Sequence, residues 1–257
     1  MDHKTKQRTY NTILSICFTF ILFICITGML VGCTTGGSKA NLKNSVSYDG
    51  IDYFIQENIG LNFDGFHDFN EGLGELCEKV GSIRHADVYK ILGLEQSDWI
   101  FLDNNSMLSS DDPYGGIYRS SRVKMDTIAD FKPDYLDIYY LTPPTSEQSG
   151  TEIQIFNTED IKIIEKIVTA IESGKTVPSE KQAEVTKAMH YGDNNYHSYR
   201  LEFLSENYPN LVYRLFYAED INGKFYIGYY GDIAAYKIIE IDDTLHKYLS
   251  TKTSTGE

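Results

Sequence analysis

The chain opens with a basic segment that runs into a long stretch without any charged side chain. Lys4, Lys6 and Arg8 stand against the single Asp2, and the nineteen residues 13–31 contain no Asp, Glu, Lys or Arg. Such a stretch partitions into a bilayer, and it can just span the roughly 30 Å hydrocarbon layer as a helix. A basic start followed by an apolar centre is typical of a secretory signal. Length alone leaves a retained membrane anchor open.

The end of the apolar stretch, Leu30-Val31-Gly32-Cys33, resembles the lipobox of bacterial lipoproteins. The resemblance implies that residues 1–32 are a cleaved signal peptide and that the Cys33 thiol carries lipid, including palmitate. Two or more acyl chains give stable anchoring where one does not. Residues 33–44 are then a flexible tether, since they are rich in small and polar side chains. An uncleaved transmembrane helix with an incidental cysteine is the alternative.

Charge excludes some classes of partner. Without residues 1–32 the chain has 20 Lys and Arg against 36 Asp and Glu, a formal charge of −16. A chain this acidic is expected to repel nucleic acid and anionic lipid. The same excess favours solubility, and it is also compatible with a basic partner or divalent cations.

The four cysteines do not predict a disulfide framework. Cys17 and Cys25 lie in the apolar stretch, and Cys33 is the expected lipidation site, so only Cys77 remains in the mature body. The core must therefore be stable without disulfides. Cys77 lies in the apolar pattern of Leu73, Leu76 and Val80, which predicts a buried small hydrophobic residue rather than a nucleophile.

The first half of the mature chain has mixed periodicity. Helical spacing predicts helices over residues 71–80 and 86–92, and aromatic or β-branched runs predict strands over 51–55, 98–102 and 135–141. The polar segment between the last two strands is expected to be irregular. Pro143 and Pro144 begin a small and polar run, so residues 142–150 are predicted to link domains 45–141 and 151–250. A long surface loop within one domain is the rival interpretation.

The second half is more regular. Strands are predicted at 152–156, 198–204, 211–218, 224–230 and 235–241, with helices at 159–173 and from Asp242 or Asp243 to Leu249. Asn157 or Thr158 is the expected cap of the first helix. The order β-α-β-β-β-β-α predicts an antiparallel meander with packed helices, followed by a tail at 251–257. The fold class is thus α+β, with two small domains.

Residues 156–165, together with Tyr199-Arg200-Leu201-Glu202-Phe203 and Tyr213-Arg214-Leu215-Phe216-Tyr217, resemble small domains of uncharacterised YhfM-like Gram-positive lipoproteins. The resemblance covers about residues 150–250. It implies a location outside the membrane and a fold, but it brings no catalytic motif and no chemistry.

Two acidic loops and two histidines are candidate metal sites. Residues 103–112 are rich in oxygen ligands, yet Met107 takes a ligand position of a calcium loop. Asp64, His67 and Asp68 form one cluster, while His190 and His197 flank a second, and neither has the spacing of a zinc site. We therefore predict no metal site, no cofactor and no catalytic residue.

Tyrosines supply the one candidate contact surface. If Asn222-Gly223 forms a two-residue hairpin turn, Tyr213, Tyr217, Tyr226 and Tyr230 share one face of the meander. Tyr rings combine contact area with a hydroxyl, so an open face of this kind is predicted to bind a protein or glycan partner. Cross-strand pairing on a solvated sheet face and burial against the first domain explain the same residues.

The sequence thus favours a membrane-anchored extracytoplasmic lipoprotein that acts as a non-enzymatic binding or accessory module. The alternative is a hydrolase of cell-wall or other extracellular polymers, with carboxylates from the loops at 64–68 or 103–112.

Overall fold

The computed structural model describes residues 44–104, 113–142, 150–191, 193, 195–229 and 237–253. Most of these residues form antiparallel sheets with a few helices, which agrees with the predicted α+β class. Residues 42–257 form one compact unit. Cys33, the expected signal peptide and Tyr230 lie outside the described residues. No helix in the described part of the chain is long and apolar enough to cross a membrane.

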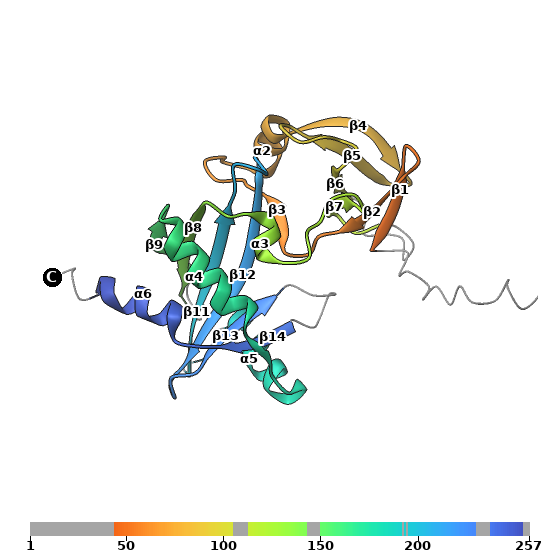
Figure 1. Cartoon of the computed structure of the whole chain (residues 1–257). Helices are drawn as coiled ribbons and strands as arrows, with labels where there is room; N and C mark the ends of the chain where they lie inside the picture. Colours follow the sequence, from red (N-terminus) through yellow and green to blue (C-terminus); the bar gives the residue numbers. More distant parts are fainter. Residues whose placement is uncertain are drawn as a thin grey trace, which may run out of the picture. The chain divides into compact units, whose positions relative to one another are not determined.

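The first sheet curls around its own small core. Its strand order is β1-β2-β7-β6-β5-β4, and the strands are β1 (Ser45–Tyr48), β2 (Ile51–Ile55), β4 (Cys77–Ile83), β5 (Ala86–Ile91), β6 (Trp99–Asp103) and β7 (Gly116–Ser120). The outer strands β1 and β4 come near each other (Figure 1). The Tyr48 hydroxyl joins them by donating to the Val80 carbonyl at 3.0 Å. The enclosed side chains are Val46, Tyr53, Val88, Ile100, Leu102 and Tyr118.

The second sheet carries helices on both faces. Its order is β10-β14-β13-β12-β11-β8-β9, with β3 also paired to β12. The strands are β3 (Ile59–Leu61), β8 (Tyr135–Leu141), β9 (Glu152–Thr158), β10 (Lys175–Thr176), β11 (Tyr196–Leu204), β12 (Leu211–Asp220), β13 (Phe225–Tyr229) and β14 (Lys237–Ile241). Helices α4 (Ile161–Glu172) and α6 (Thr244–Thr253) cover one face, and α5 (Ser179–Tyr191) packs on part of the other (Figure 1).

The predicted division into two domains is not confirmed. Strand β8 belongs to the proposed first domain, yet it lies between β11 and β9 in the second sheet. Leu141 pairs with Glu152, so the segment 142–150 connects neighbouring strands of one sheet. Residues 143–149 themselves lie outside the described part. Because the hydrogen bonds of β8 go to later strands, the proline-rich run marks a connection within the sheet.

The predicted hairpin register was wrong by one residue. Asp220 pairs with Lys224 through the hydrogen bond from Asp220 N to Lys224 O, at 2.9 Å, which leaves a three-residue loop. The Asp220 carboxylate accepts from the backbone N–H groups of Asn222 and Lys224, and Gly223 has φ +73°. A polar side chain that caps the turn and a glycine in the left-handed region favour this longer loop. Ile221 therefore lies in the loop and points to solvent, with 65% of its surface exposed.

Several predicted elements also changed type. Residues 86–91 form strand β5 and not a helix, because Ala86 and Val88 are both buried and alternate with less buried residues, as in a strand. The helix expected at 71–80 is α2 (Phe69–Leu76), and its last residues belong to β4. Apolar runs as short as these are compatible with both the helical period and the strand period.

No element was predicted between residues 102 and 135 or between residues 173 and 198, yet both segments contain regular structure. They form β7, α3 (Ile128–Phe131) and α5. Two local signals mark these helices: the capping box of Thr127 and Asp130, and the spacing of Val185, Ala188 and Met189. The cap of α4 is Asp160, and not Asn157 or Thr158.

Other predictions are confirmed. The strand at Tyr135–Leu141 has the predicted bounds, and α4 lies within the helix predicted at 159–173, with Ile164, Ile167 and Ile171 buried. Cys77 is 6% exposed, and burial raises the pKa of its thiol to about 12. It is therefore a core residue with an unreactive thiol.

Candidate functional site

A cleft of about 950 Å³ lies where the two sheets meet. It is lined by β2 and β7 of the first sheet and by β3, β12, β13 and β14 of the second, with α3 and the end of α4 beside them. This volume is within the roughly 300–1,000 Å³ range of small-molecule sites. Polar and aromatic residues in its wall include Asn44, Phe54, Gln56, Asn58, Arg119, Asp126, Glu172, Tyr213, Tyr229 and Lys237.

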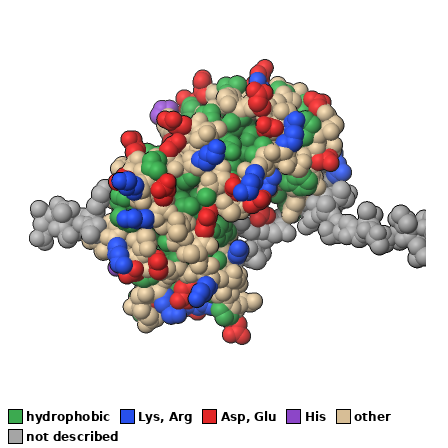
Figure 2. All heavy atoms as spheres, viewed as in Figure 1, with side chains coloured by type: hydrophobic (Ala, Val, Ile, Leu, Met, Phe, Trp, Pro, Cys, Tyr) green, Lys and Arg blue, Asp and Glu red, His purple; other side chains and the backbone are tan. Residues whose placement is uncertain are grey.

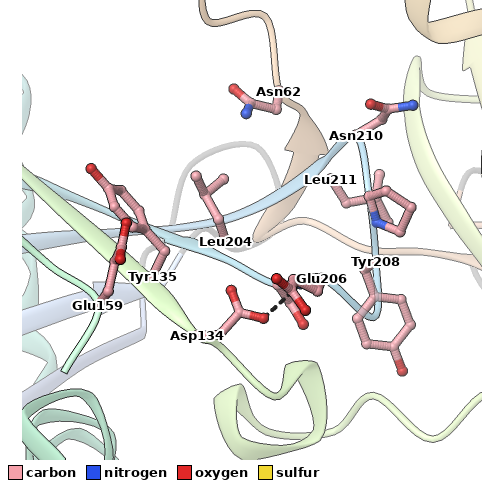
Figure 3. Close-up of a pocket in the computed structure, with 11 residues that line it drawn as sticks. Asn62, Asp134, Tyr135, Glu159, Leu204, Glu206, Tyr208, Asn210 and Leu211 are labelled. Atoms are coloured by element: carbon pink, nitrogen blue, oxygen red, sulfur yellow. Dashed lines mark hydrogen bonds between the residues drawn. The ribbon is translucent and has the colours of Figure 1, made fainter. Parts of the chain in front are cut away.

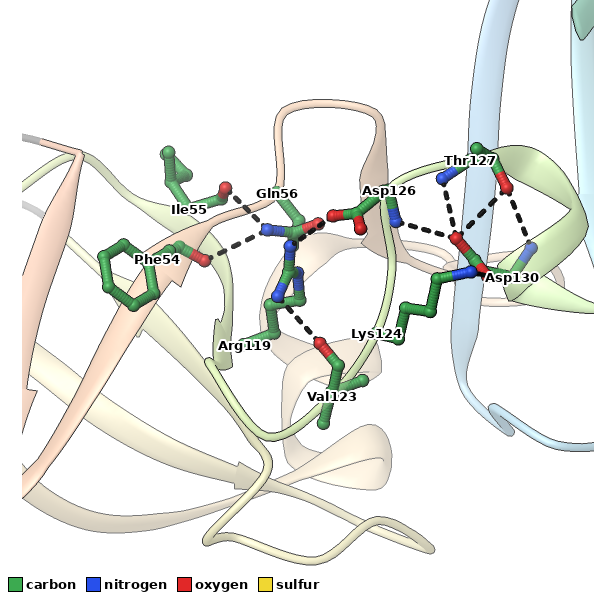
Figure 4. A network of polar contacts seen from close by, with 9 residues as sticks. All are labelled: Phe54, Ile55, Gln56, Arg119, Val123, Lys124, Asp126, Thr127 and Asp130. Carbon is green, nitrogen blue, oxygen red and sulfur yellow. Dashed lines mark hydrogen bonds and ion pairs between the residues drawn. The ribbon is translucent and has the colours of Figure 1, made fainter.

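Arg119 is held by the segment that leads into α3. Its Nη1 donates to the Val123 carbonyl at 2.7 Å, and its Nη2 donates to Asp126 Oδ1 at 3.2 Å (Figure 4). The side chain is 17% exposed, so these contacts fix it inside the wall. A guanidinium group held in this way forms hydrogen bonds in fixed directions, whereas a flexible ammonium group acts as a mobile point charge.

The capping box of α3 in turn positions Asp126. Asp130 accepts from the backbone N–H groups of Asp126 and Thr127 at 3.0 and 3.1 Å, and from Lys124 Nζ at 2.8 Å (Figure 4). The Lys124 contact is the main cause that lowers the pKa of Asp130 to about 2, with the backbone and Thr127 contacts adding to it. The carboxylate thus keeps its charge over a wide pH range and locks the loop.

Two buried polar atoms in this wall have no hydrogen-bond partner among the residues that the structure describes. They are the Oδ1 of Asn44, an acceptor, and the Nε of Arg119, a donor. A buried polar group without a partner costs about 1–3 kcal/mol. Both atoms are buried, so a molecule in the cleft would pair with them only after neighbouring side chains move aside.

Tyrosines form the floor of the cleft on the second sheet. Burial raises the pKa of the Tyr229 hydroxyl to about 12, with the Glu172 carboxylate adding to it, and burial also raises the pKa of Tyr213. Both hydroxyls are therefore neutral. Lys237 Nζ lies 5.6 Å from the centre of the Tyr229 ring, and Glu172 accepts from the Ala129 N–H at 3.0 Å.

A second, smaller hollow of about 450 Å³ is acidic. Its wall includes the carboxylates of Asp134, Glu159 and Glu206 with the rings of Tyr135 and Tyr208 (Figure 3). Asp134 accepts from the Glu206 backbone N–H at 2.7 Å, so one of these carboxylates is occupied by the turn that it stabilises. An acidic wall of this kind disfavours anions.

A buried network of acids and arginines lies on the face of the second sheet that α5 partly covers. Glu202 is 2% exposed, and its Oε1 lies 2.7 Å from Arg214 Nε and 3.1 Å from Arg200 Nε. Asp137 accepts from Gln154, and burial raises its pKa. The packed geometry and the two cations around Glu202 indicate a structural role.

The tyrosine face predicted from the sequence does not exist as an open surface. Tyr213, Tyr217 and Tyr226 are 7%, 0% and 0% exposed. In the observed register Tyr226 lies opposite Ala218, while Tyr217 lies opposite Ile227. A shift of one residue sends Tyr226 to the other side of the sheet, under α5. Tyr213 does line the cleft, whereas Tyr230 lies outside the described residues.

The predicted acidic loops are not brought together as a metal site. Asp68 caps α2 through the Glu71 N–H at 2.9 Å, and Asp64 is exposed. Within the described ranges no group of three or more His, Cys, Asp or Glu is arranged to hold a metal ion. Residues 105–112 and the side chain of His190 lie outside those ranges, and His197 is exposed.

Comparison of the chain with protein-family models, curated proteins and solved structures finds no match. The chemistry of the cleft therefore has to be inferred from its own residues. The sequence reading missed Arg119, Asn44 and Phe54. The motif Thr127-Ile128-Ala129-Asp130 was the one local signal that pointed to this region.

Proposed function

We propose that this chain is a bacterial lipoprotein, acylated at Cys33, that presents a non-enzymatic binding module on the extracytoplasmic face of the cell membrane. The sequence Leu30-Val31-Gly32-Cys33 behind an uncharged stretch supports the lipid anchor. Residues 33–44 would then hold the compact unit away from the bilayer. Its acidic charge keeps such a unit soluble and off anionic lipid.

The cleft between the sheets is the observation that carries the binding role. It combines a volume of about 950 Å³ with rigidly held polar groups, among them Arg119. Sites of this kind are concave, largely preformed and equipped with a few directed polar groups. The ligand would be held by residues from both sheets, so binding would also stiffen their junction.

Metabolic labelling with palmitate tests the anchor. Label is expected on the wild type and on the control Cys25→Ser, but not on Cys33→Ser. Labelling of Cys33→Ser as strong as that of the wild type would overturn the lipoprotein assignment.

Thermal unfolding of the detergent-solubilised full-length Cys33→Ser chain tests the cleft. Neutral oligosaccharides, peptides, amino acids and nucleotides serve as probes, and a bound probe raises the melting temperature. The shift should disappear in Arg119→Gln and persist in Arg122→Gln, whose guanidinium contacts Ser97 and Asp98 instead. Absence of any shift, or an equal shift in both variants, contradicts the proposal.

Hydrolysis of an extracellular polymer is the rival proposal, and one observation favours it. Burial raises the pKa of Asp137, and the charges of Asp64 and Glu202 raise it further. A buried carboxyl with a raised pKa beside other carboxyl groups is the pattern of general acid chemistry. Release of reducing ends from cell-wall polymer by the wild type, and its loss in Asp64→Asn, would favour the rival.

A further inference from the structure

The two unpaired atoms of the cleft differ in hydrogen-bonding character. Arg119 Nε offers a proton, and Asn44 Oδ1 offers a lone pair. A ligand that satisfies both must donate and accept. Hydroxyl groups do both from a single atom, whereas carboxylates and phosphates only accept and ammonium groups only donate.

The charges in the cleft wall nearly balance, since Arg119 and Lys237 stand against Glu57, Asp126 and Glu172. Arg119 is paired with Asp126, Glu172 accepts a backbone N–H, and Lys237 lies over the Tyr229 ring. The whole chain carries a formal charge of −14, and Figure 2 shows acidic and basic side chains interspersed on one face. An anionic ligand would therefore be repelled at long range by the acidic chain and would meet more carboxylates than cations in the wall.

An aromatic ring is exposed at the same place. Phe54 lines the cleft, is 41% exposed and pairs across strands with Arg119, so both side chains lie on one face of the first sheet. Tyr229 supplies a second, half-buried ring from the opposite wall. Sugar rings have apolar C–H faces that pack on aromatic rings, and their edges carry hydroxyls.

From these three features we propose that the cleft binds a neutral, polyhydroxylated glycan chain, an inference that rests on the proposed binding function. A sugar ring packs on Phe54, and its hydroxyl groups pair with Arg119 Nε and Asn44 Oδ1, which are buried in the unbound chain, once neighbouring side chains move aside. The amides of Gln56 and Asn58 line the same wall.

Isothermal titration calorimetry of the full-length Cys33→Ser chain tests this class of ligand. The probes are neutral tetrasaccharides of glucose, mannose and N-acetylglucosamine, with a neutral peptide of similar mass for comparison. At least one tetrasaccharide should bind, and Phe54→Ala should weaken it by about tenfold or more. Phe69→Ala is the matched control, since Phe69 is 45% exposed and does not line the cleft.

Arg119→Gln, with Arg122→Gln as its control, is titrated in the same way and provides a second test if Phe54→Ala folds poorly. Failure of every tetrasaccharide, or binding that Phe54→Ala leaves unchanged, overturns the glycan inference. Binding of the peptide alone, with the same sensitivity to Phe54→Ala, overturns the glycan class and leaves the binding function standing. If no class of probe gives a response that depends on the cleft residues, both the glycan inference and the proposed binding function are wrong.

Discussion

The Tyr217 hydroxyl donates to Glu219 Oε1 at 2.7 Å, and the same oxygen lies 3.0 Å from Nδ1 of His246 on α6. A side chain predicted to face solvent thus connects the centre of the second sheet to the C-terminal helix. Burial is the main cause that raises the pKa of the Tyr217 hydroxyl, followed by the Glu219 carboxylate. The hydroxyl therefore stays protonated and acts as a donor.

Two buried tyrosines should respond oppositely to loss of their hydroxyl. Tyr217→Phe leaves Glu219 short of a donor and should destabilise the fold by about 1–3 kcal/mol. Tyr226→Phe removes a buried hydroxyl that has no partner in the described part of the chain, so it should be neutral or stabilise by up to about 1 kcal/mol. Urea unfolding of the two variants measures both effects. Equal small effects would agree with the exposed tyrosine face and contradict the observed register.

Two glycines of α2 form a second matched pair. A Cβ at Gly72 would lie 2.4 Å from a ring carbon of Phe63, whereas a Cβ at Gly74 meets nothing within 4 Å. Gly72→Ala should therefore cost about 1–3 kcal/mol through overpacking. Gly74→Ala should stabilise by up to about 1 kcal/mol through helix propensity. Thermal unfolding compares them, and a stabilised Gly72→Ala would contradict the packing of the 62–68 loop on α2.

The capping box of α3 predicts a pH dependence of stability. The pKa of Asp130 is about 2 in the folded chain, below the ordinary 3.8, so folding favours the ionised carboxylate. This contribution is complete above about pH 4 and is lost as the pH falls toward 2. Asp130→Ala should be less stable than the wild type by about 1–2 kcal/mol at neutral pH. The difference should shrink at low pH, and a difference that stays constant with pH would contradict this role.

Cys77 should be protected from thiol reagents. With a thiol pKa near 12 instead of 9, thiolate is on the order of a thousandfold scarcer at mildly alkaline pH. Reaction with a disulfide reagent, taken as the difference between wild type and Cys77→Ala, should be slow in the native chain and fast in urea. Rapid native reaction would mean that the start of β4 opens readily.

Local sequence patterns were sufficient to predict secondary structure and burial where these depend on one segment alone. The branched and aromatic run at 135–141 forms a strand because such side chains suit a pleated surface, and the apolar stripe of α4 is buried because it has helical period. Cys77 is buried for the same reason. The signal-like start and Cys33 remain predictions, since those residues lie outside the described structure.

Tertiary structure decided what depends on distant partners. Residues 86–91 are a strand because β4 and β6 supply hydrogen bonds on both sides, and 142–150 is a connection because β9 returns beside β8. The Asp220 side chain shifted the hairpin by one residue and so buried the tyrosines on opposite faces. The cleft joins residues from Asn44 to Lys237. Periodicity reports which side of a segment is apolar, but it contains no information on which remote segment covers that side.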